Sequence, residues 1–247
     1  DKSRSRGLGD VYKRQQLVND GIPSVLFSLE MSARSIMYRL ISLLGKIELK
    51  KLFEAKNLSD SDFNEIENSL SLLSRSKFFI DDTSSLSPSE ILSRSRKLKR
   101  ENPDLGLIII DYMQLMRADT RNDNRVSEMN EISRSLKALA KEIDVPVIAL
   151  SQLNRAPETR TGKRPVLADL KDSGAIEQDA DIVTFVFRAE KYEQDLENKG
   201  LAIIDVAKHR NGPTGSVKLH FSDKYTKFQD LALDDPALRN PDFTEDD

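Results

Sequence analysis

The chain has 247 residues, of which 38 are lysine or arginine and 41 are aspartate or glutamate, so its formal net charge is −3. It has no cysteine and two histidines, which excludes disulfides and thiolate metal sites and leaves little for a zinc site. This charge argues against a diffuse basic surface, so contact with nucleic acid would need a local cluster or repetition around an oligomer.

No apolar run approaches the length of a membrane span, and no secretory signal pattern stands at the start. We therefore expect no contact with a membrane and a cytoplasmic protein. A chain of this length can form one large domain with a substantial core.

Strands and helices are expected to alternate over the first two thirds of the chain. Residues 24–29 are an apolar run, and Ala33 to Leu44 then carry apolar side chains at helical spacing. Ser59 and Ser87 are placed to cap two helices, the second in a capping box with Glu90. Further strands are expected at residues 78–82, 105–110 and 145–150, and a further amphipathic helix at residues 126–143.

Strands dominate the rest of the chain, after a polar stretch at residues 151–180. The expected strands are residues 181–187, 200–210 and 216–221, and a Gly-Pro turn at residues 211–215 predicts a hairpin between the last two. The fold class is therefore α/β, with a mixed sheet that is parallel in its centre, flanked by helices and ended by a C-terminal β-hairpin. Residues 231–247 are expected to form an acidic disordered tail.

Three apolar strands are each followed by a polar residue, namely Glu30, Asp111 and Gln152. Because ligands bind beyond the carboxyl ends of parallel strands, we expect the three side chains to meet at one edge. Asp111 suits a carboxylate that holds Mg²⁺ through water, and Glu30 suits a base that polarises an attacking water. A single acid at a strand end is as often a cap for the next element, so only the three together indicate a site.

Two basic groups stand outside that edge. Lys208 and Arg210 alternate along one strand, so both side chains point the same way and could reach a neighbour's phosphate; the plain alternative is a solvated sheet edge. Lys171 and Gly174 lie in a polar segment suited to gripping a DNA backbone through charge and main-chain N–H groups. By composition alone, that segment is only a polar loop.

Five stretches, taken in order, carry a resemblance to a known family: LFSLEM, LGLIIIDYMQLM, EISRSLKALAKEIDVPVIALSQLNR, DLKDSGAIEQDADIV and AKHRNGPTG. From about Gly21 to Phe228 the chain resembles the C-terminal RecA-like motor domain of DnaB-family replicative helicases. The resemblance implies a RecA-like P-loop NTPase core, ATP and Mg²⁺ as cofactors, and an ATP-dependent DNA helicase. It also implies a homohexameric full-length parent that moves 5′ to 3′ along single-stranded DNA, with a helicase loader and primase as candidate partners.

The same resemblance assigns roles to residues of the nucleotide site. Glu30 is similar to the catalytic glutamate and Asp111 to the Walker B aspartate. Gln152 is similar to the switch glutamine, and Arg39 to the family's nucleotide-contacting arginine. On the residues alone, Arg39 would be an exposed helix charge.

The resemblance also assigns the basic groups. Lys208 and Arg210 are similar to the lysine and arginine fingers offered to the neighbouring subunit, where they would contact its nucleotide. Lys171, Asp172 and Gly174 fall in the family's DNA-binding loop. Relatives commonly have Arg-Glu-Ser-Gly there, and Lys keeps the charge of Arg but loses its bidentate fork, so a looser grip on phosphate is expected.

One motif of the family is missing. A Walker A loop, G-x-x-x-x-G-K-[ST], should precede Gly21, yet residues 1–16 contain Gly7 and Gly9 without any Gly-Lys-Ser/Thr. We therefore expect residues 1–15 to be a non-native segment and residues 16–230 to be a truncated motor domain that hydrolyses ATP poorly or not at all. The alternatives are another RecA-like ATPase, such as a RadA-type recombination protein, and a degenerate module without catalysis.

Overall fold

The structure is a computed structural model that describes residues 21–120, 124–153, 164–188, 190 and 199–231. The segment that we expect to be non-native, residues 1–15, lies outside these ranges. The expected acidic tail also lies outside them, apart from its first residue.

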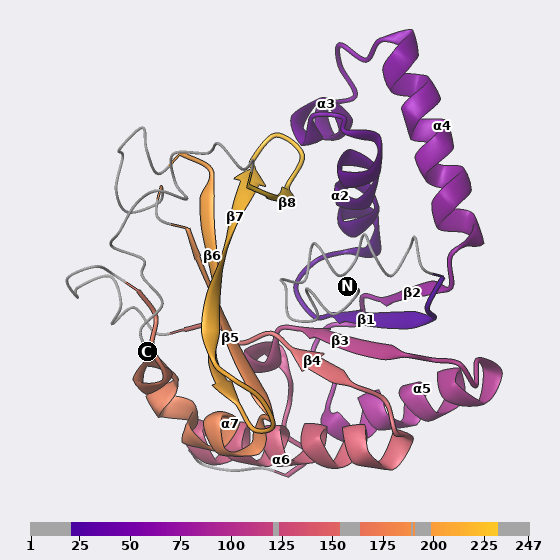
Figure 1. Cartoon of the computed structure of the whole chain (residues 1–247). Coiled ribbons are helices and arrows are strands. Elements are labelled where there is room, and N and C mark those ends of the chain that lie inside the picture. The colour runs from indigo at the N-terminus through magenta and orange to yellow at the C-terminus, as the bar shows by residue number, and fades with distance from the viewer. Residues whose placement is uncertain (1–20, 121–123, 154–163, 189, 191–198, 232–247) are drawn as a thin grey trace.

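The first part of the chain alternates strands with helices, as the sequence predicts (Figure 1). The strands are β1 (Ser24–Ser28), β2 (Phe78–Asp81), β3 (Leu107–Asp111) and β4 (Val147–Ala149). The helices are α2 (Ala33–Gly45), α3 (Leu49–Glu54), α4 (Asp60–Arg75), α5 (Pro88–Glu101) and α6 (Arg125–Ile143), and a single 3-10 turn, η1 (Met113–Leu115), follows β3. The sequence pattern predicts all of these elements except α3 and η1.

The four strands form a parallel sheet in the order β2-β1-β3-β4. In its centre Val25 lies beside Ile108 and Phe27 beside Ile110. Every residue of β1 and the first four of β3 are buried. Burial on both faces explains why these strands are unbroken apolar runs in the sequence instead of alternating patterns.

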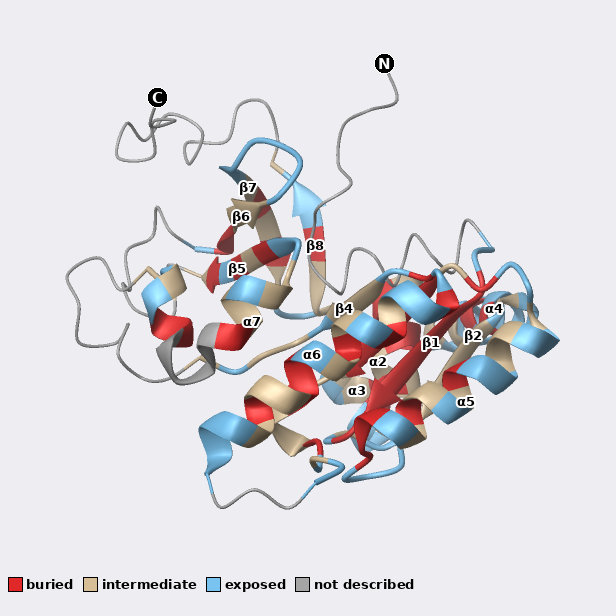
Figure 2. Ribbon diagram, turned by 90° about the horizontal axis from the view of Figure 1, so that it is seen from below, coloured by how far each residue is buried: buried red, intermediate tan, exposed pale blue. Residues whose placement is uncertain are grey.

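Alternate residues of the central strands point to opposite faces of the sheet. Val25 and Phe27 pack with Ile91 of α5 and Ile132 of α6. Leu26 packs on the other face, in a second cluster built from α2, α3 and α4. Figure 2 shows the buried parts of α5 and α6 beside β1. The sheet is therefore covered by helices on both faces, and its strand ends remain as the place for a ligand.

Two helix starts that the sequence predicts are confirmed. Ser59 accepts a hydrogen bond from the backbone N–H of Asp62, and Ser87 accepts one from the backbone N–H of Glu90. In both cases the acidic side chain accepts in return from the backbone of the capping serine, which completes a capping box. Each box fixes the residue at which its helix begins.

The second part of the chain contains η3 (Leu167–Ser173), α7 (Gly174–Asp179), β5 (Ile182–Arg188), β6 (Leu201–His209), β7 (Gly215–Ser222) and β8 (Lys227–Asp230). The four strands form an antiparallel sheet in the order β5-β6-β7-β8. The predicted hairpin is confirmed as β6 and β7. The sequence pattern predicts neither β8 nor the helical turns η3 and α7.

The α/β class is confirmed, but the sheet needs one correction. The strands form two separate four-stranded sheets, one parallel and one antiparallel, instead of a single mixed sheet. β4 pairs with β3 over only three residues, and within the described ranges no strand pairs with its other edge. The pairing of strands depends on where they lie in the tertiary structure. The pattern of apolar residues along one strand predicts the strand itself but not its partner.

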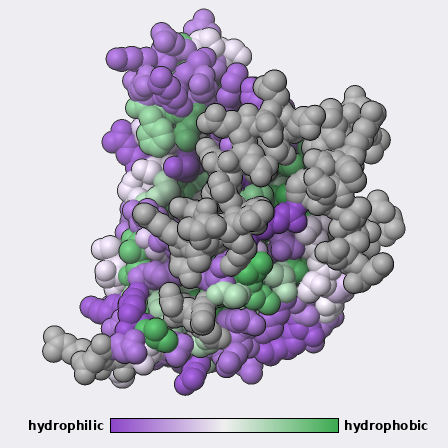
Figure 3. All heavy atoms as spheres, turned by 90° about the vertical axis from the view of Figure 1, so that its left-hand side faces the viewer, coloured by the Kyte–Doolittle hydropathy of each residue, from purple (hydrophilic) through white to green (hydrophobic). Residues whose placement is uncertain are grey.

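The described surface is polar on the face that Figure 3 shows, where hydrophilic residues surround small separate hydrophobic patches. Of the helices that the structure describes, none is long and apolar enough to cross a membrane.

Candidate nucleotide site at the carboxyl ends of the parallel strands

Three neighbouring parallel strands end side by side, and each has a predicted site residue at or just beyond its end. Beyond the last pair of β1 and β3, the Leu29 N–H donates to the Asp111 carbonyl at 2.8 Å. β4 pairs with the other edge of β3. Glu30, Asp111 and Gln152 therefore leave the sheet at the same edge, as the sequence predicts.

The turn that carries Glu30 is held by the last residue of β1. The Ser28 hydroxyl donates to the Met31 carbonyl at 2.8 Å and accepts from the Met31 N–H at 3.2 Å. These two bonds close the turn around Glu30, whose side chain is exposed. Ser32 then caps α2. Because the turn is short and closed, it holds the Glu30 carboxylate in solvent at a fixed position relative to β1.

Arg39 lies on α2, whose first turn is anchored to the end of β2 by a bond from the Ala33 N–H to Asp82 Oδ2 at 2.8 Å. The Nε atom of Arg39 is buried and has no hydrogen-bond partner among the described residues. A buried guanidinium N–H without a partner is costly. This donor therefore remains available to a bound nucleotide or to residues outside the described ranges.

Asp111 is the last residue of β3 and is half-buried. Within the described residues, no group of three or more histidine and acidic side chains gathers as a metal site would. Mg²⁺ at a nucleotide site does not need one, because it is commonly held by one or two carboxylates together with phosphate oxygens and water. The single carboxylate of Asp111 fits that kind of coordination.

Gln152 follows β4 by three residues, and its side chain is exposed. Its main chain is held by the side chain of Gln114, a contact that no pattern in the sequence predicts. Gln114 lies three residues after Asp111, in the same motif. An amide so close to the end of the strand is the one feature of the sequence that could have pointed to it.

Lys208 lies on β6 and Arg210 directly follows that strand, and both side chains reach one place. Lys208 Nζ donates to the carbonyls of Glu177 and Gln178, and Arg210 donates to the Gln178 carbonyl at 3.2 Å. Arg210 also pairs with Asp181 at 3.1 Å. Both cations thus bind the last carbonyls of α7, which is where a helix leaves acceptors unsatisfied.

The end of α7 is also tied to α6. The Ser133 hydroxyl donates to Asp179 at 2.8 Å, and Lys137 of α6 pairs with Asp181. The hydrogen bond from Lys137 and the nearby charge of Arg210 lower the pKa of Asp181. Within the described residues, none of these contacts reaches Glu30, Asp111 or Gln152.

Lys171 and Asp172 lie in η3, and Gly174 is the first residue of α7. Their side chains lie outside what the structure describes, so their predicted contact with DNA stays a prediction. The described link between this segment and the two cations runs through the backbone of α7. Gly174 begins that helix, and its last carbonyls bind Lys208 and Arg210.

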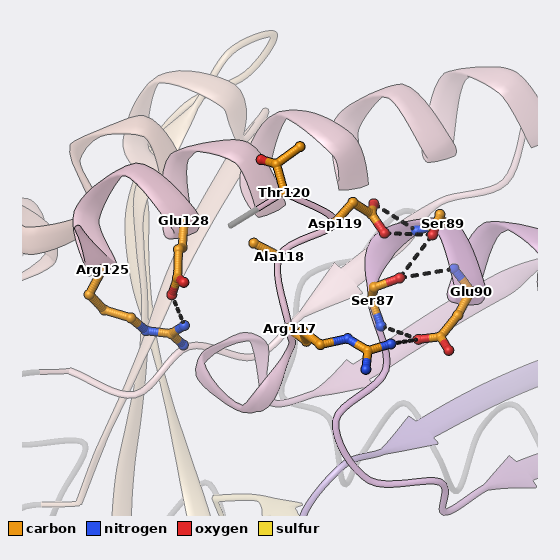
Figure 4. A pocket seen from close by; sticks show the side chains of 9 residues that line it. All are labelled: Ser87, Ser89, Glu90, Arg117, Ala118, Asp119, Thr120, Arg125 and Glu128. Atoms are coloured by element: carbon orange, nitrogen blue, oxygen red, sulfur yellow. Dashed lines mark hydrogen bonds and ion pairs between the residues drawn. The ribbon is translucent and has the colours of Figure 1, made fainter. Parts of the chain in front are cut away.

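A cavity of about 650 Å³ lies elsewhere, between the start of α5, residues 117–120 and the start of α6 (Figure 4). Arg117 pairs with Glu90 there, Arg125 pairs with Glu128, and Asp119 accepts from the backbone and hydroxyl of Ser89. Each arginine of the lining is thus paired with a glutamate, Asp119 is bound by Ser89, and none of the predicted site residues lines the cavity. The strand ends therefore remain the candidate site.

Known proteins are similar to this chain in sequence and in fold. The model of the DnaB-like helicase C-terminal domain family matches residues 10–230. The chain is 48% identical over 211 residues to the replicative DNA helicase DnaB of Haemophilus influenzae, which covers 85% of this chain and 45% of that protein. The chain thus spans about half the length of the curated relatives it matches.

Two solved structures are similar over most of the described fold. One, a structure of an ATPase domain, superposes with a TM-score of 0.86 at 37% identity, covering 90% of this chain and 80% of that one. A DnaB-like replicative helicase, solved together with its interactions with primase, gives 0.84 at 39% identity, covering 87% of this chain and 53% of that one. The resemblance and the RecA-like fold are confirmed, and the chain belongs to the DnaB-like helicase C-terminal domain family.

Proposed function

We propose that this chain is part of the motor of a replicative DNA helicase. In this proposal, ATP hydrolysis drives movement along single-stranded DNA in the 5′ to 3′ direction and unwinds the duplex ahead. The observation that supports it most is the arrangement of Glu30, Asp111 and Gln152 on adjacent strand ends of a DnaB-like domain.

Each residue at the strand ends has a distinct role in the proposal. Asp111 holds Mg²⁺, which when bound neutralises charge on the phosphates. Glu30 accepts a hydrogen bond from the attacking water, which orients it, and takes the proton of that water as its oxygen attacks the terminal phosphorus. Arg39 donates to the nucleotide, and the amide of Gln152 contacts the terminal phosphate and reports its presence to the DNA-binding segment.

Lys208 and Arg210 act, in the proposal, on the nucleotide of a neighbouring subunit in a homohexamer. They stand at the end of β6 in the second sheet, Lys208 within the strand and Arg210 just after it, and their described contacts are with α7 and Asp181. A cation offered across a subunit boundary in this way stabilises the charge of the transition state and contributes roughly 10³- to 10⁵-fold to turnover in other NTPases.

Single-stranded DNA is the proposed track, bound by Lys171, Asp172 and Gly174. A lysine there supplies charge without the paired N–H groups of arginine, so each subunit would hold phosphate less rigidly. Because the net charge of the chain is −3, its overall charge does not attract DNA, so contact would depend on local basic segments such as this one and on their repetition around a ring.

Further partners and the location complete the proposal. A helicase loader and primase are the proposed protein partners, and the cytoplasm is the proposed location. One similar structure is described by its interactions with primase, which supports the choice of that partner.

The test is steady-state ATP hydrolysis with and without single-stranded DNA. A full-length protein that contains this chain should show Mg²⁺-dependent turnover that rises when DNA is added. The 247-residue chain, whose first 20 residues hold no Gly-Lys-Ser/Thr, should show little or no turnover. Failure of DNA to stimulate the full-length protein would contradict the proposed motor. Equal turnover by the two proteins would contradict the need for a Walker A loop outside this chain.

A further inference from the structure

The side chain of Gln114 is bound to the chain that follows β4. Its Nε2 donates to the Ser151 hydroxyl at 2.9 Å and to the Gln152 carbonyl at 3.0 Å. Its Oε1 accepts from the Gln152 N–H at 3.1 Å. One amide thus satisfies both main-chain groups of Gln152, and both of its own N–H groups are used.

These bonds continue the pairing of β3 and β4 beyond the sheet. The Leu150 N–H donates to the Ile110 carbonyl, and the Met113 N–H donates to the Leu150 carbonyl, each at 2.9 Å. At the next position, the side chain of Gln114 takes the place that a strand backbone would occupy. β4 itself is only three residues long, so its backbone pairing with β3 ends before Gln152. The side chain of Gln114 holds the chain there instead.

Gln114 is itself held in place. Its neighbour Met113 is buried in the cluster under α6, and so is Met116 at the end of the turn. Arg125, at the start of α6, donates to the Gln114 carbonyl and pairs with Glu128 at 2.6 Å. The amide therefore projects from an anchored turn, which fixes its position relative to the strand ends.

We propose that Gln114 is a positioning residue that fixes the main chain of Gln152, so that the exposed side chain of Gln152 meets the terminal phosphate at one place. This rests on the role of Gln152 in the proposed function. Gln114 does not act on the nucleotide itself, because the hydrogen-bonding groups of its amide are taken by Ser151 and Gln152.

The first test replaces Gln114 by Met, which has a similar length but makes no hydrogen bond of this kind. In the 247-residue chain, amide hydrogen exchange at Gln152 should speed up about tenfold or more, since a protecting bond is lost. In the full-length protein, kcat with single-stranded DNA should fall roughly ten- to a hundredfold while the Kd for nucleotide changes less than about twofold. Gln229→Met, an exposed glutamine on β8, is the matched control and should change neither quantity.

The second test separates positioning from a general structural role. If Gln114 acts through Gln152, then Gln114→Met should lower kcat by less than about twofold in a Gln152→Ala protein. A full additional loss in that background would overturn the proposal, and so would an unchanged kcat in the single variant. A different result would contradict the proposed function, namely the absence of DNA-stimulated hydrolysis in the unmodified protein.

A second variant keeps the test decisive if Gln114→Met does not fold, as judged by its thermal unfolding. Gln114→Glu keeps the shape and the acceptor for the Gln152 N–H but loses both donors. It should lower kcat in the same direction and should likewise have little effect in a Gln152→Ala protein. Normal kcat with Gln114→Glu would overturn the proposal.

Discussion

Glu30 is an exposed carboxylate two residues beyond a fully buried strand, in a turn that the hydroxyl of Ser28 closes. Its distance from the sheet is fixed, but its side chain is free to meet solvent. Those are the requirements for the proposed base, which must orient a water molecule beside a nucleotide whose Mg²⁺ Asp111 would hold.

Replacing Glu30 by Gln keeps the size of the side chain and removes the base. In a full-length protein that contains this chain, nucleotide binding should be preserved, while kcat should fall by about 10²- to 10⁴-fold. Binding is measured with a fluorescent nucleotide and turnover by phosphate release. Glu67→Gln, an exposed change on α4, is the control. Undiminished hydrolysis in the Glu30 variant would remove Glu30 from the catalytic role.

The strand-end residues can be predicted because their signal is local. An apolar run followed by a polar residue predicts a buried strand and the edge it reaches, so Glu30, Asp111 and Gln152 are expected together. Gln114 cannot be found in this way. Nothing in its spacing distinguishes an amide that binds a distant main chain from one that faces solvent, because its partners lie 37 and 38 residues further along the chain.

At the level of elements, β2 and α5 are joined by an ion pair near the same edge. Arg94 donates to Asp81 Oδ2 at 2.5 Å and to the hydroxyl of Thr83 at 2.8 Å. Partial burial alone would raise the pKa of Asp81, but hydrogen bonds from Arg94 and Thr83 outweigh it and lower the pKa below its ordinary value of 3.8. The ionised carboxylate is therefore favoured by folding.

This pair predicts a pH dependence of stability. Because the pKa of Asp81 is lower in the folded chain, its contribution is complete above the unfolded value of 3.8 and is lost as the pH falls through the folded value. Asp81→Asn should cost roughly 0.5 to 1 kcal/mol of unfolding free energy near neutral pH, as expected of a partly exposed pair.

Urea unfolding at a series of pH values measures this cost. The difference between the original chain and Asp81→Asn should shrink as the pH drops below about 4. Asp230→Asn, at the exposed end of β8, is the control. A difference that stays constant down to the lowest pH would show that the carboxylate charge contributes nothing.

Some elements can be predicted from the sequence and others cannot, for reasons visible in their contacts. α5 is predictable because its Ser-Pro-Ser-Glu start carries the whole capping box within four residues. α3 and β8 are short, and the chain before β8 meets the start of α3 through the Leu49 N–H, which donates to the Lys224 carbonyl at 3.1 Å. Contacts between residues so far apart in the chain leave no periodic pattern in either segment.

At the scale of the whole molecule, the two sheets carry different parts of the proposed nucleotide site. Glu30, Asp111 and Gln152 lie at strand ends of the parallel sheet. Lys208 and Arg210 lie at the end of β6 in the antiparallel sheet, where they bind the end of α7. Two half-sites on one chain suit a ring in which each nucleotide lies between neighbours, because a head-to-tail interface joins different surfaces of identical subunits.

Mixing two inactive proteins tests this division. Full-length Glu30→Gln and Arg210→Ala should each have little turnover, and rings assembled from equal amounts of both should regain complete sites in roughly a quarter of their interfaces. The control mixes Glu30→Gln with the double variant Glu30→Gln, Arg210→Ala, which offers no complete site. No recovery in the first mixture would indicate that Arg210 acts within its own subunit.

The central claim, that this chain belongs to the motor of a helicase, is tested most directly by strand separation. A full-length protein that contains the chain should, with ATP and Mg²⁺, unwind a duplex with a single-stranded 5′ tail and leave one with a 3′ tail intact, and Glu30→Gln should abolish the activity. ATP hydrolysis without unwinding of either substrate, or exchange of strands in place of unwinding, would contradict the claim and indicate a different kind of RecA-like ATPase.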